Sequence, residues 1–158
     1  MLAVLTSQGV ERVRGALACA GLADTIVELP GAARTAKAAA QFLGCEVGQI
    51  ANSLVFRASD RPLLVMSSGA KRVDLERLAA LVGEPVCKAD ADFVRRHTGF
   101  VIGGVAPVGH GLARAFVEKS LAAYRELWAA AGHPHTVFPL SYAELLRVTG
   151  GLAVQCAS

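Results

Sequence analysis

Two strand-like segments joined by a turn near residue 60 constrain this fold more than any other feature of the sequence. Ile50–Arg57 has a mostly β-favouring centre, Asp60-Arg61-Pro62 has the composition of a turn, and Leu63–Ser67 is again apolar. Two such runs around a short turn predict a β-hairpin. An antiparallel pair in mid-chain favours a mixed sheet with helices packed around it over a doubly wound parallel sheet.

Other β-favouring segments predict the rest of the sheet. Leu127–Ala131 is ambiguous, because its alanine and leucine would also suit a helix. The turn residues Gly132-His133-Pro134 and the β-favouring Thr136-Val137-Phe138 follow it, so we predict a hairpin with Leu127–Ala131 as its first arm. Short strands are also expected at Thr25–Leu29, Val86–Lys88, Phe100–Ile102, Ala115–Glu118 and Leu152–Gln155. We estimate about six or seven strands in the sheet.

Capping residues and apolar periodicity predict the helices. Ser141 and Glu144 have the spacing of a capping box, which is a signature of a helix N-terminus. The expected helices are Ser7 to about Ala20, Thr35–Leu43, Val73–Val82, Asp90–His97 and Ser141–Val148. The whole pattern predicts a single compact domain over residues 1–158 of the α/β (α+β) class, with a mixed, largely antiparallel twisted sheet surrounded by helices.

The composition is that of a globular chain. Hydrophobic residues make up 53% and charged residues 18% of its 158 residues, and the net charge is +3. The basic residues are scattered, whereas a dedicated nucleic-acid binder usually carries a stripe of them. The charge therefore permits a phosphate-bearing partner without requiring one. The apolar runs are too short for a membrane span or a secretory signal, so we expect a cytoplasmic protein.

The cysteines and histidines give no sign of a metal site. The four cysteines, at positions 19, 45, 87 and 156, lie far apart, and no secretory signal precedes them. That spacing indicates reduced thiols. His133 and His135 form the only close histidine pair, at a predicted turn. Because zinc needs clustered ligands, we expect neither a metal nor an organic cofactor.

The segment from Phe100 to Gly111 carries the strongest chemical signal. Gly103 and Gly104 allow backbone angles that are closed to other residues, and Pro107 stiffens the path of the loop. Such a loop can turn several N–H groups toward one point, which suits the oxyanion of ester hydrolysis and equally suits a phosphate or carboxylate. An ordinary glycine-rich turn between two strands would have the same composition.

Several well-known catalytic motifs do not occur in the sequence. Gly104 and Gly109 have the outer spacing of a Walker loop, but His110-Gly111 stands where that motif needs Lys-Ser/Thr. There is no Gly-x-Ser-x-Gly elbow, and no local sequence supports a Cys–His pair. A hydrolase built on this chain would therefore have to position water and stabilise the oxyanion.

Several blocks of the sequence resemble, in the same order, those of the YbaK/EbsC family, which includes the prolyl-tRNA synthetase-associated domain. Gly103-x-x-x-Pro107 is similar to that family's glycine-x-x-x-proline loop. The other matching blocks are Thr35–Ala40, Gly48–Phe56, Ala131–Pro134, Val137–Leu140, Glu144–Leu146 and Thr149–Gly151. Each block alone is weak, and the ordered set over most of the chain carries the resemblance.

The resemblance implies an aminoacyl-tRNA deacylase, which hydrolyses the ester between a wrong amino acid and the 3′-terminal ribose of tRNA. It implies mischarged tRNA as the substrate and water as the nucleophile. It also implies that backbone donors between Gly103 and Pro107 hold the substrate carbonyl. The chain is similar to the free-standing members of the family, because no synthetase sequence flanks it. An aminoacyl-tRNA synthetase is a further partner that the resemblance allows.

The chain departs from the family pattern at Asn52, where relatives carry a lysine that contacts the substrate near its amine and terminal phosphate. Asparagine keeps a hydrogen-bond donor and loses the charge, which Lys37 or Lys71 can supply from elsewhere. Alanine-clearing relatives carry a lys-asn-leu and a his-pro-leu motif. Here Asn52-Ser53-Leu54 and Phe138-Pro139-Leu140 stand instead, so alanine-tRNA is not the first choice of substrate.

The predicted site combines one strand residue with the glycine-rich loop. The predicted catalytic residues, expected to converge on one pocket, are Asn52, Gly103, Gly104, Val105, Ala106 and Pro107. The predicted substrate-binding residues are Thr35, Lys37, Ser53, Ser68, Lys71 and His110. His110 either reaches a ribose or phosphate or bonds the loop backbone, and Asn52 can alternatively bond a neighbouring loop. Two rival functions are a non-catalytic binder of an aminoacyl-adenosine end, nucleotide or amino-acid derivative, and a regulatory partner of a synthetase.

Overall fold

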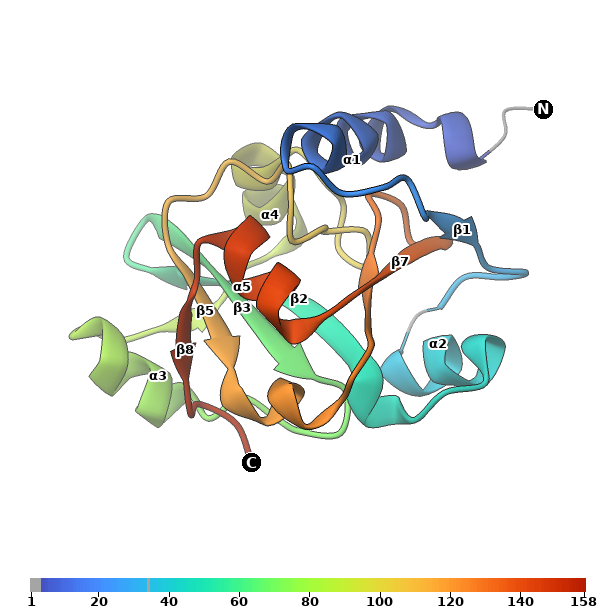
Figure 1. Cartoon of the computed structure of the whole chain (residues 1–158). Coiled ribbons are helices and arrows are strands. Elements are labelled where there is room, and N and C mark those ends of the chain that lie inside the picture. The colour runs from blue at the N-terminus through green and yellow to red at the C-terminus, as the bar shows by residue number, and fades with distance from the viewer. Residues whose placement is uncertain (1–3, 34) are drawn as a thin grey trace.

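The computed structural model describes residues 4–33 and 35–158, and a twisted sheet of eight strands runs through its centre (Figure 1). The strand order is β1-β7-β6-β2-β3-β5-β8, and β4 pairs with β2 outside this path. Four pairings are antiparallel and three are parallel. The predicted α/β class with a mixed, largely antiparallel sheet is therefore confirmed, although the sheet has more strands than we estimated.

The bounds of the elements follow the predicted order along the chain. The strands are β1 (Val27–Glu28), β2 (Ile50–Ala58), β3 (Arg61–Ser68), β4 (Cys87–Lys88), β5 (Ala115–Glu118), β6 (Leu127–Ala130), β7 (Thr136–Leu140) and β8 (Leu152–Val154). The helices are α1 (Gln8–Cys19), α2 (Ala36–Leu43), α3 (Leu75–Val82), α4 (Ala91–Thr98) and α5 (Tyr142–Thr149), with short 3-10 helices η1 (Val4–Thr6), η2 (Val47–Gln49) and η3 (Lys119–Ala123). The strand assigned to Leu127–Ala131 is confirmed as β6.

Capping side chains begin the helices where the sequence predicts them. In all five α-helices the residue before the first turn accepts a hydrogen bond from a backbone N–H of that turn, and in α3, which begins later than predicted, this residue is Asp74. In the other four helices the capping residue stands where the predicted helix begins. These residues are Ser7, Thr35, Asp90 and Ser141. Ser141 and Glu144 also form the reciprocal capping box. The helix boundaries thus come from local chemistry that the sequence displays.

The turn of the central hairpin is tighter than predicted. Ala58 pairs with Arg61, so the turn consists of Ser59 and Asp60 alone. Ser59 has a φ of 56°, as the first residue of a two-residue hairpin turn requires. Arg61 and Pro62, predicted to be turn residues, belong to β3 instead.

The strand predicted at Phe100–Ile102 is wrong. These residues follow α4 directly and lie in an irregular segment that continues to β5. Phe100 is buried beneath the Arg12 guanidinium of α1, which lies 4.2 Å from the ring centroid, and the chain then enters a turn. Several other elements are shorter than predicted. Thr25–Leu29 narrows to β1, β4 and β8 each lose one residue, and α3 begins only after Val73, which forms a β-bridge to Ala157.

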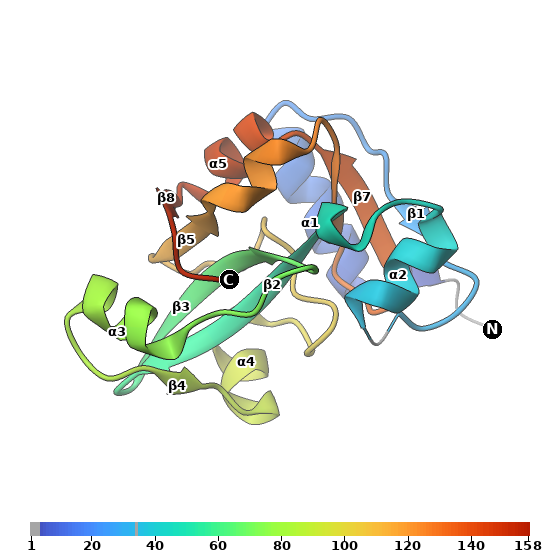
Figure 2. The same ribbon diagram turned by 90° about the horizontal axis from the view of Figure 1, so that it is seen from below.

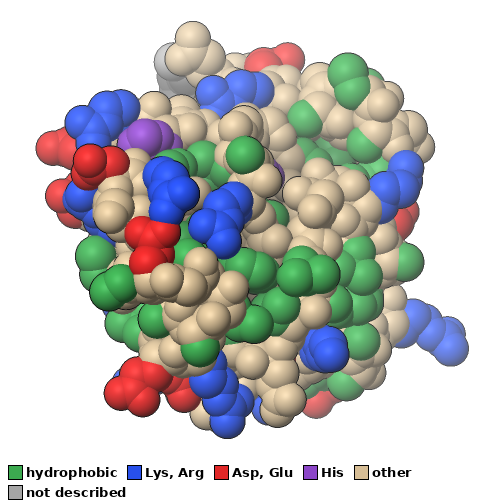
Figure 3. Space-filling model, turned by 90° about the vertical axis from the view of Figure 1, so that its left-hand side faces the viewer, with side chains coloured by type: hydrophobic (Ala, Val, Ile, Leu, Met, Phe, Trp, Pro, Cys, Tyr) green, Lys and Arg blue, Asp and Glu red, His purple; other side chains and the backbone are tan. Residues whose placement is uncertain are grey.

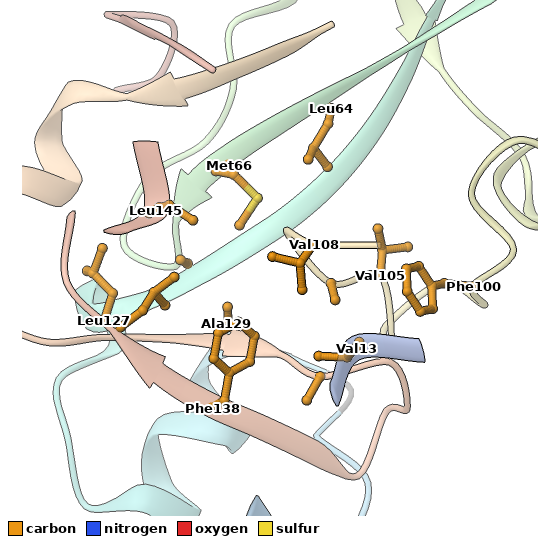
Figure 4. Packing of buried hydrophobic residues seen from close by; sticks show 14 of the residues in the cluster. Val13, Leu64, Met66, Phe100, Val105, Val108, Leu127, Ala129, Phe138 and Leu145 are labelled. Carbon is orange, nitrogen blue, oxygen red and sulfur yellow. The ribbon is translucent and has the colours of Figure 1, made fainter. Parts of the chain in front are cut away.

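Alternation of side chains along β2 and β3 divides the core between the two faces of the sheet. Leu64 and Met66 belong to the larger cluster, which α1, α4, α5 and the segment before β5 cover. Leu63 and Val65 belong to the smaller cluster, which α3 covers. Figure 4 shows the larger cluster, with Val105 of the segment before β5 beside Phe100 and Val13. That segment is therefore anchored in the core.

The arrangement of helices leaves the two ends of β2 in different surroundings. α2 lies at one end of the β2–β3 hairpin, and α3 and β4 lie toward the other end (Figures 1 and 2). On the side of the molecule at the left of Figure 1, hydrophobic side chains form a band, with acidic and basic side chains mixed around it (Figure 3). Within the described residues, no helix has the length and apolar character needed to cross a membrane.

Candidate functional site

One edge of β2 is uncovered over the middle of the strand. β6 pairs with β2 only at residues 50–51, and β4 pairs with it only at residues 56–57. Between these contacts, no other strand of the described chain lies beside β2 on this edge, and one backbone hydrogen bond joins the Ala89 N–H to the Val55 carbonyl at 3.4 Å. An open strand edge presents backbone donors and acceptors that a ligand can pair with.

Ser53 presents its backbone to this gap. The N–H and C=O groups of every second residue of a strand point to the same edge, so Ser53 shares the direction of the Val55 carbonyl. The Ser53 side chain turns elsewhere, because its hydroxyl donates to the Met66 sulfur at 3.3 Å. Ser53 therefore offers main-chain groups to the gap.

Two pockets meet over the gap. The neutral pocket, of about 260 Å³, lies between β2, the start of α2 and the β6–β7 turn, and no charged side chain of the described residues lines it. The basic pocket, of about 590 Å³, lies between β2, β4, α4 and the segment before α3, and it includes Lys71, Arg72 and Lys88. The residues that line both pockets are Ser53, Leu54, Ile102, Gly103 and Val105.

The structure brings half of the predicted site residues to these pockets. Asn52 and Thr35 line the neutral pocket, Lys71 lines the basic pocket, and Ser53, Gly103 and Val105 line both. The predicted residues that line neither pocket are Lys37, Ser68, Gly104, Ala106, Pro107 and His110. Asn52 and the start of the glycine-rich loop thus share one pocket, while the later part of the loop packs into the core.

Two of the polar residues that were predicted for the site but line neither pocket make structural hydrogen bonds instead. The buried Ser68 hydroxyl donates to the Gly48 carbonyl at 2.9 Å and accepts from the Ala70 N–H at 3.2 Å. His110 is buried, and its Nδ1 accepts from the Leu112 N–H at 2.9 Å. Burial lowers the pKa of His110, which favours a neutral imidazole that braces the loop backbone. A third residue that lines neither pocket, Lys37, is exposed on α2.

A turn at residues 101–104 fixes the loop where it meets β2. The Gly104 N–H donates to the Val101 carbonyl at 2.9 Å, and Gly103 has a φ of 90°, a left-handed value that favours glycine. The Gly104 donor is therefore already used. Within the described chain, no hydrogen bond satisfies the N–H of Gly103 or that of Val105, although Val105 is only 3% exposed. A buried N–H without a partner is rare and suits a site that holds a ligand oxygen.

The β6–β7 turn supports this loop from behind. A Cβ atom at residue 104 would lie 3.0 Å from the backbone N of His133, and one at residue 103 would lie 3.7 Å from the Pro134 side chain. His133 is braced in turn, because its Nδ1 accepts from the His135 N–H at 3.1 Å. Sequence reasoning identified this hairpin but not its contact with the loop, since the two segments are about thirty residues apart in the chain.

α1 holds the beginning of the same loop. The Arg12 guanidinium donates to the Thr98 carbonyl at the end of α4 and lies over the Phe100 ring. A cation over an aromatic face is attracted to the ring, and here the contact also closes the end of a helix. No pattern in the sequence indicates this role, because Arg12 looks like any exposed residue of an amphipathic helix.

No side chain in either pocket has the chemistry of an activated nucleophile. None of the cysteines lines a pocket, and burial raises the pKa of Cys156 to about 11, with a smaller contribution from Glu118. Among residues 4–33 and 35–158, no group of three or more His, Cys, Asp or Glu is placed to hold a metal. A further cavity of about 390 Å³ beside α1 and the start of α5 contains none of the predicted residues.

Comparison with known proteins gives a consistent picture. The model of a family described as the aminoacyl-tRNA editing domain matches residues 31–148. The solved structure of a candidate trans-editing enzyme for prolyl-tRNA synthetase is similar, with a TM-score of 0.90 and 44% identity over 96% of this chain and 98% of the other. Uncharacterized protein YwhH of Bacillus subtilis is 27% identical over 126 residues, which are 77% of this chain and 79% of YwhH. A proline–tRNA ligase of Thermosipho melanesiensis is 29% identical over 89 residues, 56% of this chain but only 16% of the ligase.

Proposed function

Because the chain belongs to the aminoacyl-tRNA editing domain family, we propose that it is an aminoacyl-tRNA deacylase that clears mischarged tRNA in trans. Every residue that lines the neutral or the basic pocket lies within the matched residues 31–148. The similarity to a candidate trans-editing enzyme supports action outside a synthetase. The partial similarity to a proline–tRNA ligase supports a relation to prolyl-tRNA synthesis.

The observation that carries this proposal is the meeting of two unlike pockets at Gly103. An aminoacyl-tRNA has an amino acid on one side of its ester and a ribose with phosphates on the other. The smaller neutral pocket suits the amino-acid side, and the larger basic pocket suits the nucleotide side. The ester would then lie at their shared lining, beside the free N–H groups of Gly103 and Val105.

This placement supports a reaction in which water is the nucleophile. Water adds to the ester carbonyl carbon, and the carbonyl oxygen becomes an oxyanion that the N–H groups of Gly103 and Val105 stabilise. The bond from carbon to the ribose oxygen then breaks, the ribose oxygen gains the proton that water loses, and the free amino acid leaves. Each donor of an oxyanion hole typically accounts for about a hundredfold or more in rate. No pocket side chain needs to act as a base, because the substrate's own amine and ribose hydroxyl can relay the proton.

Asn52 has the role of orienting the substrate in this scheme. It is half-buried on β2 and lines the neutral pocket, where its amide can donate and accept one hydrogen bond each without adding charge. A neutral pocket of about 260 Å³ favours a small or medium amino acid with an uncharged side chain. Aspartate, glutamate, lysine and arginine would leave a charge unpaired there, so tRNAs bearing them should be poor substrates.

Single-turnover deacylation of a panel of mischarged tRNAs tests this function. We expect saturating enzyme to release at least one uncharged amino acid faster than the spontaneous rate, and Gly103→Val to abolish the excess. Gly15→Ala is the matched control, because residue 15 lies on α1 with nothing within 4 Å of an added Cβ. Retention of charged tRNA without release would mean that the protein is a binder instead of an enzyme. If the protein neither releases the amino acid nor retains the tRNA, the result would favour a synthetase-associated regulatory role.

A further inference from the structure

A buried hydroxyl without a hydrogen-bond partner lies beside Asn52. Ser67 on β3 is 1% exposed, and within residues 4–33 and 35–158 no group hydrogen-bonds its Oγ. The neighbouring Ser68 has the usual arrangement, because its buried hydroxyl bonds both the Gly48 carbonyl and the Ala70 N–H. Since a buried polar group without a partner costs free energy, Ser67 is an unusual residue at this place in the sheet.

The register of the central hairpin places Ser67 directly opposite Asn52. Side chains of directly opposed residues in an antiparallel pair lie on the same face of the sheet, with Cβ atoms about 4.5–5.5 Å apart. Rotation about χ1 of either side chain can therefore bring the Ser67 Oγ within hydrogen-bonding distance of the Asn52 carboxamide. No hydrogen bond from the described residues occupies that carboxamide either.

The neighbour of Ser67 on the other side of β3 is already engaged. Met66 pairs with Val117 there, so Glu118 is the next residue of β5. The Glu118 carboxylate accepts three backbone N–H groups from other segments. Of the two polar side chains that flank Ser67 across the sheet, Asn52 is therefore the one whose hydrogen-bonding groups are unused.

Asn52 connects this hydroxyl to the neutral pocket. Ile50, two residues earlier on the same face of β2, packs against α2, and Leu54, two residues later, packs beside the cluster that α3 covers. Asn52 lies half-buried between these covered stretches and lines the neutral pocket. Ser67 itself lines neither pocket, so any effect that it has on a substrate passes through Asn52.

We propose that Ser67 is a positioning residue whose hydroxyl donates to the Asn52 Oδ1 and leaves the Nδ2 group facing the neutral pocket. A serine hydroxyl has one proton to donate, and Oδ1 is the acceptor of the carboxamide. With Oδ1 engaged, Asn52 offers N–H donors to the pocket, which suit a carbonyl or hydroxyl oxygen of a bound aminoacyl ester. The proposal rests on the proposed deacylase function for that substrate, and it narrows the role of Asn52 to that of a donor.

The orientation of the Asn52 carboxamide can be measured without catalysis. The probe is the pair of side-chain NH₂ resonances of Asn52 in a proton–nitrogen correlation NMR spectrum, identified by its absence in Asn52→Asp. We expect Ser67→Ala to shift this pair and Ser68→Ala, on the opposite face of β3, to leave it in place. Both Nδ2 protons of the wild type should exchange with water at similar rates. An unshifted pair in Ser67→Ala, or one Nδ2 proton that exchanges far more slowly than the other, would overturn the proposal.

Kinetics and stability separate a positioning role from a structural one. Ser67→Ala should lower the single-turnover deacylation rate about three- to tenfold, which corresponds to the loss of one hydrogen bond. In an Asn52→Ala background the same substitution should change the rate by less than about twofold, because Ser67 acts through Asn52. Equal losses of rate in the two backgrounds would contradict us.

The two neighbouring serines should also differ in their effects on stability. Ser67→Ala should leave the urea midpoint unchanged or raise it, because the desolvation of the buried hydroxyl opposes its single hydrogen bond. Ser68→Ala should lower the midpoint, because it breaks two hydrogen bonds in a buried site. A midpoint that falls as far in Ser67→Ala as in Ser68→Ala would mean that Ser67 is merely structural.

This inference and the deacylase function can fail separately. Asn52 resonances that depend on Ser67, in a protein that hydrolyses no tRNA of the panel, would support the Ser67–Asn52 pair and remove the deacylase. Hydrolysis by the wild type that is unchanged in Ser67→Ala, with the Asn52 resonances also unchanged, would support the deacylase and remove the pair.

Discussion

Gly104 packs so closely against His133 that a Cβ atom at residue 104 would lie 3.0 Å from the His133 backbone nitrogen. Its neighbour Gly103 has more room but a φ of 90°. The two adjacent glycines are thus needed for different reasons: Gly103 for its backbone angle, and Gly104 for the close contact between the loop and the β6–β7 turn. This contact holds the loop that carries Gly103 and Val105, two residues that line both pockets and whose N–H groups have no hydrogen-bond partner within the described chain.

Substitutions at the two glycines should therefore impair catalysis by different routes. Gly103→Val should distort the turn and Gly104→Val should push the loop from His133, and each should lower the single-turnover rate about a hundredfold or more. Gly103→Ala should be milder than Gly103→Val, since alanine is not β-branched. Deacylation assays on variants whose circular dichroism matches the wild type check this, with Gly15→Ala as the control. Full activity in both valine variants would contradict the backbone-oxyanion mechanism.

Glu118 organises the C-terminal segment, a role that the sequence did not reveal. Its buried carboxylate accepts from the N–H groups of Ser120 at 2.6 Å, Cys156 at 3.1 Å and Ala157 at 3.3 Å. Burial alone would raise the pKa of Glu118, but these hydrogen bonds outweigh burial and hold the pKa below its ordinary value of 4.5. Through Ala157 and Ser158, this carboxylate supports the segment that carries Arg72.

Glu118→Gln should destabilise the fold by about 2 kcal/mol at neutral pH, because an amide NH₂ replaces one acceptor and the charge is lost. A lowered pKa means that Glu118 stabilises the fold fully above pH 4.5 and loses this contribution as the pH falls through the folded-state pKa. The difference in unfolding free energy between wild type and variant should therefore shrink in acid. Urea titrations at several pH values measure it, with the exposed Glu76→Gln as the control; a difference independent of pH would refute the assignment.

Local chemistry explains which parts of the fold could be predicted. Helix N-termini at Ser7, Thr35, Asp90 and Ser141 were predictable because the cap and its donor lie within one turn of each other. The central hairpin was predictable for the same reason, although its turn was predicted at residues 60–62 and consists of Ser59 and Asp60. Phe100–Ile102 was mistaken for a strand, since an apolar run that anchors a loop in the core has the same pattern as a buried strand.

The candidate site was only partly predictable, because its remaining parts come from contacts distant in sequence. The loop pattern predicted Gly103 as a site residue, and the family resemblance predicted Asn52. Both residues line the neutral pocket. The sequence could not show that Gly104 uses its N–H within the turn, or that Lys88 reaches the same pocket as Lys71. Those facts depend on the pairing of β4 with β2 and on the path of the chain after β3.

The cysteines should be dispensable for catalysis. None of them lines either pocket, and the raised pKa of Cys156, about 11, keeps its thiol protonated at neutral pH. Replacement of each cysteine in turn by serine should change the single-turnover rate by less than about fivefold, well below the loss expected for an oxyanion donor. Cys156→Ser should lower thermal stability, because it places a hydroxyl in a buried site. Inactivity of any one cysteine variant that remains folded would instead indicate a thiol nucleophile.

Asn52→Lys tests whether the neutrality of the smaller pocket sets the choice of substrate. Lysine is longer than asparagine and would carry its charge into a pocket of about 260 Å³ that no carboxylate of the described residues lines. We expect this variant to lower the single-turnover rate on the best substrate of the wild type, because the ammonium would be poorly solvated and would compete for the space of the amino acid.

Asn52→Met separates the effect of length from that of charge, since methionine is similar in shape to lysine and uncharged. If charge is decisive, Asn52→Met should retain more deacylation activity than Asn52→Lys on tRNAs that carry small uncharged amino acids. Asn52→Lys alone should also bind a CCA trinucleotide with a 5′-phosphate more tightly than the wild type does, because it adds a cation beside the rim shared with the basic pocket. The effects of length and charge are measured by ranking the single-turnover deacylation rates of the whole tRNA panel for the wild type, Asn52→Lys and Asn52→Met. A faster rate for Asn52→Lys than for the wild type on every substrate would show that Asn52 marks a weakened site and not a different specificity.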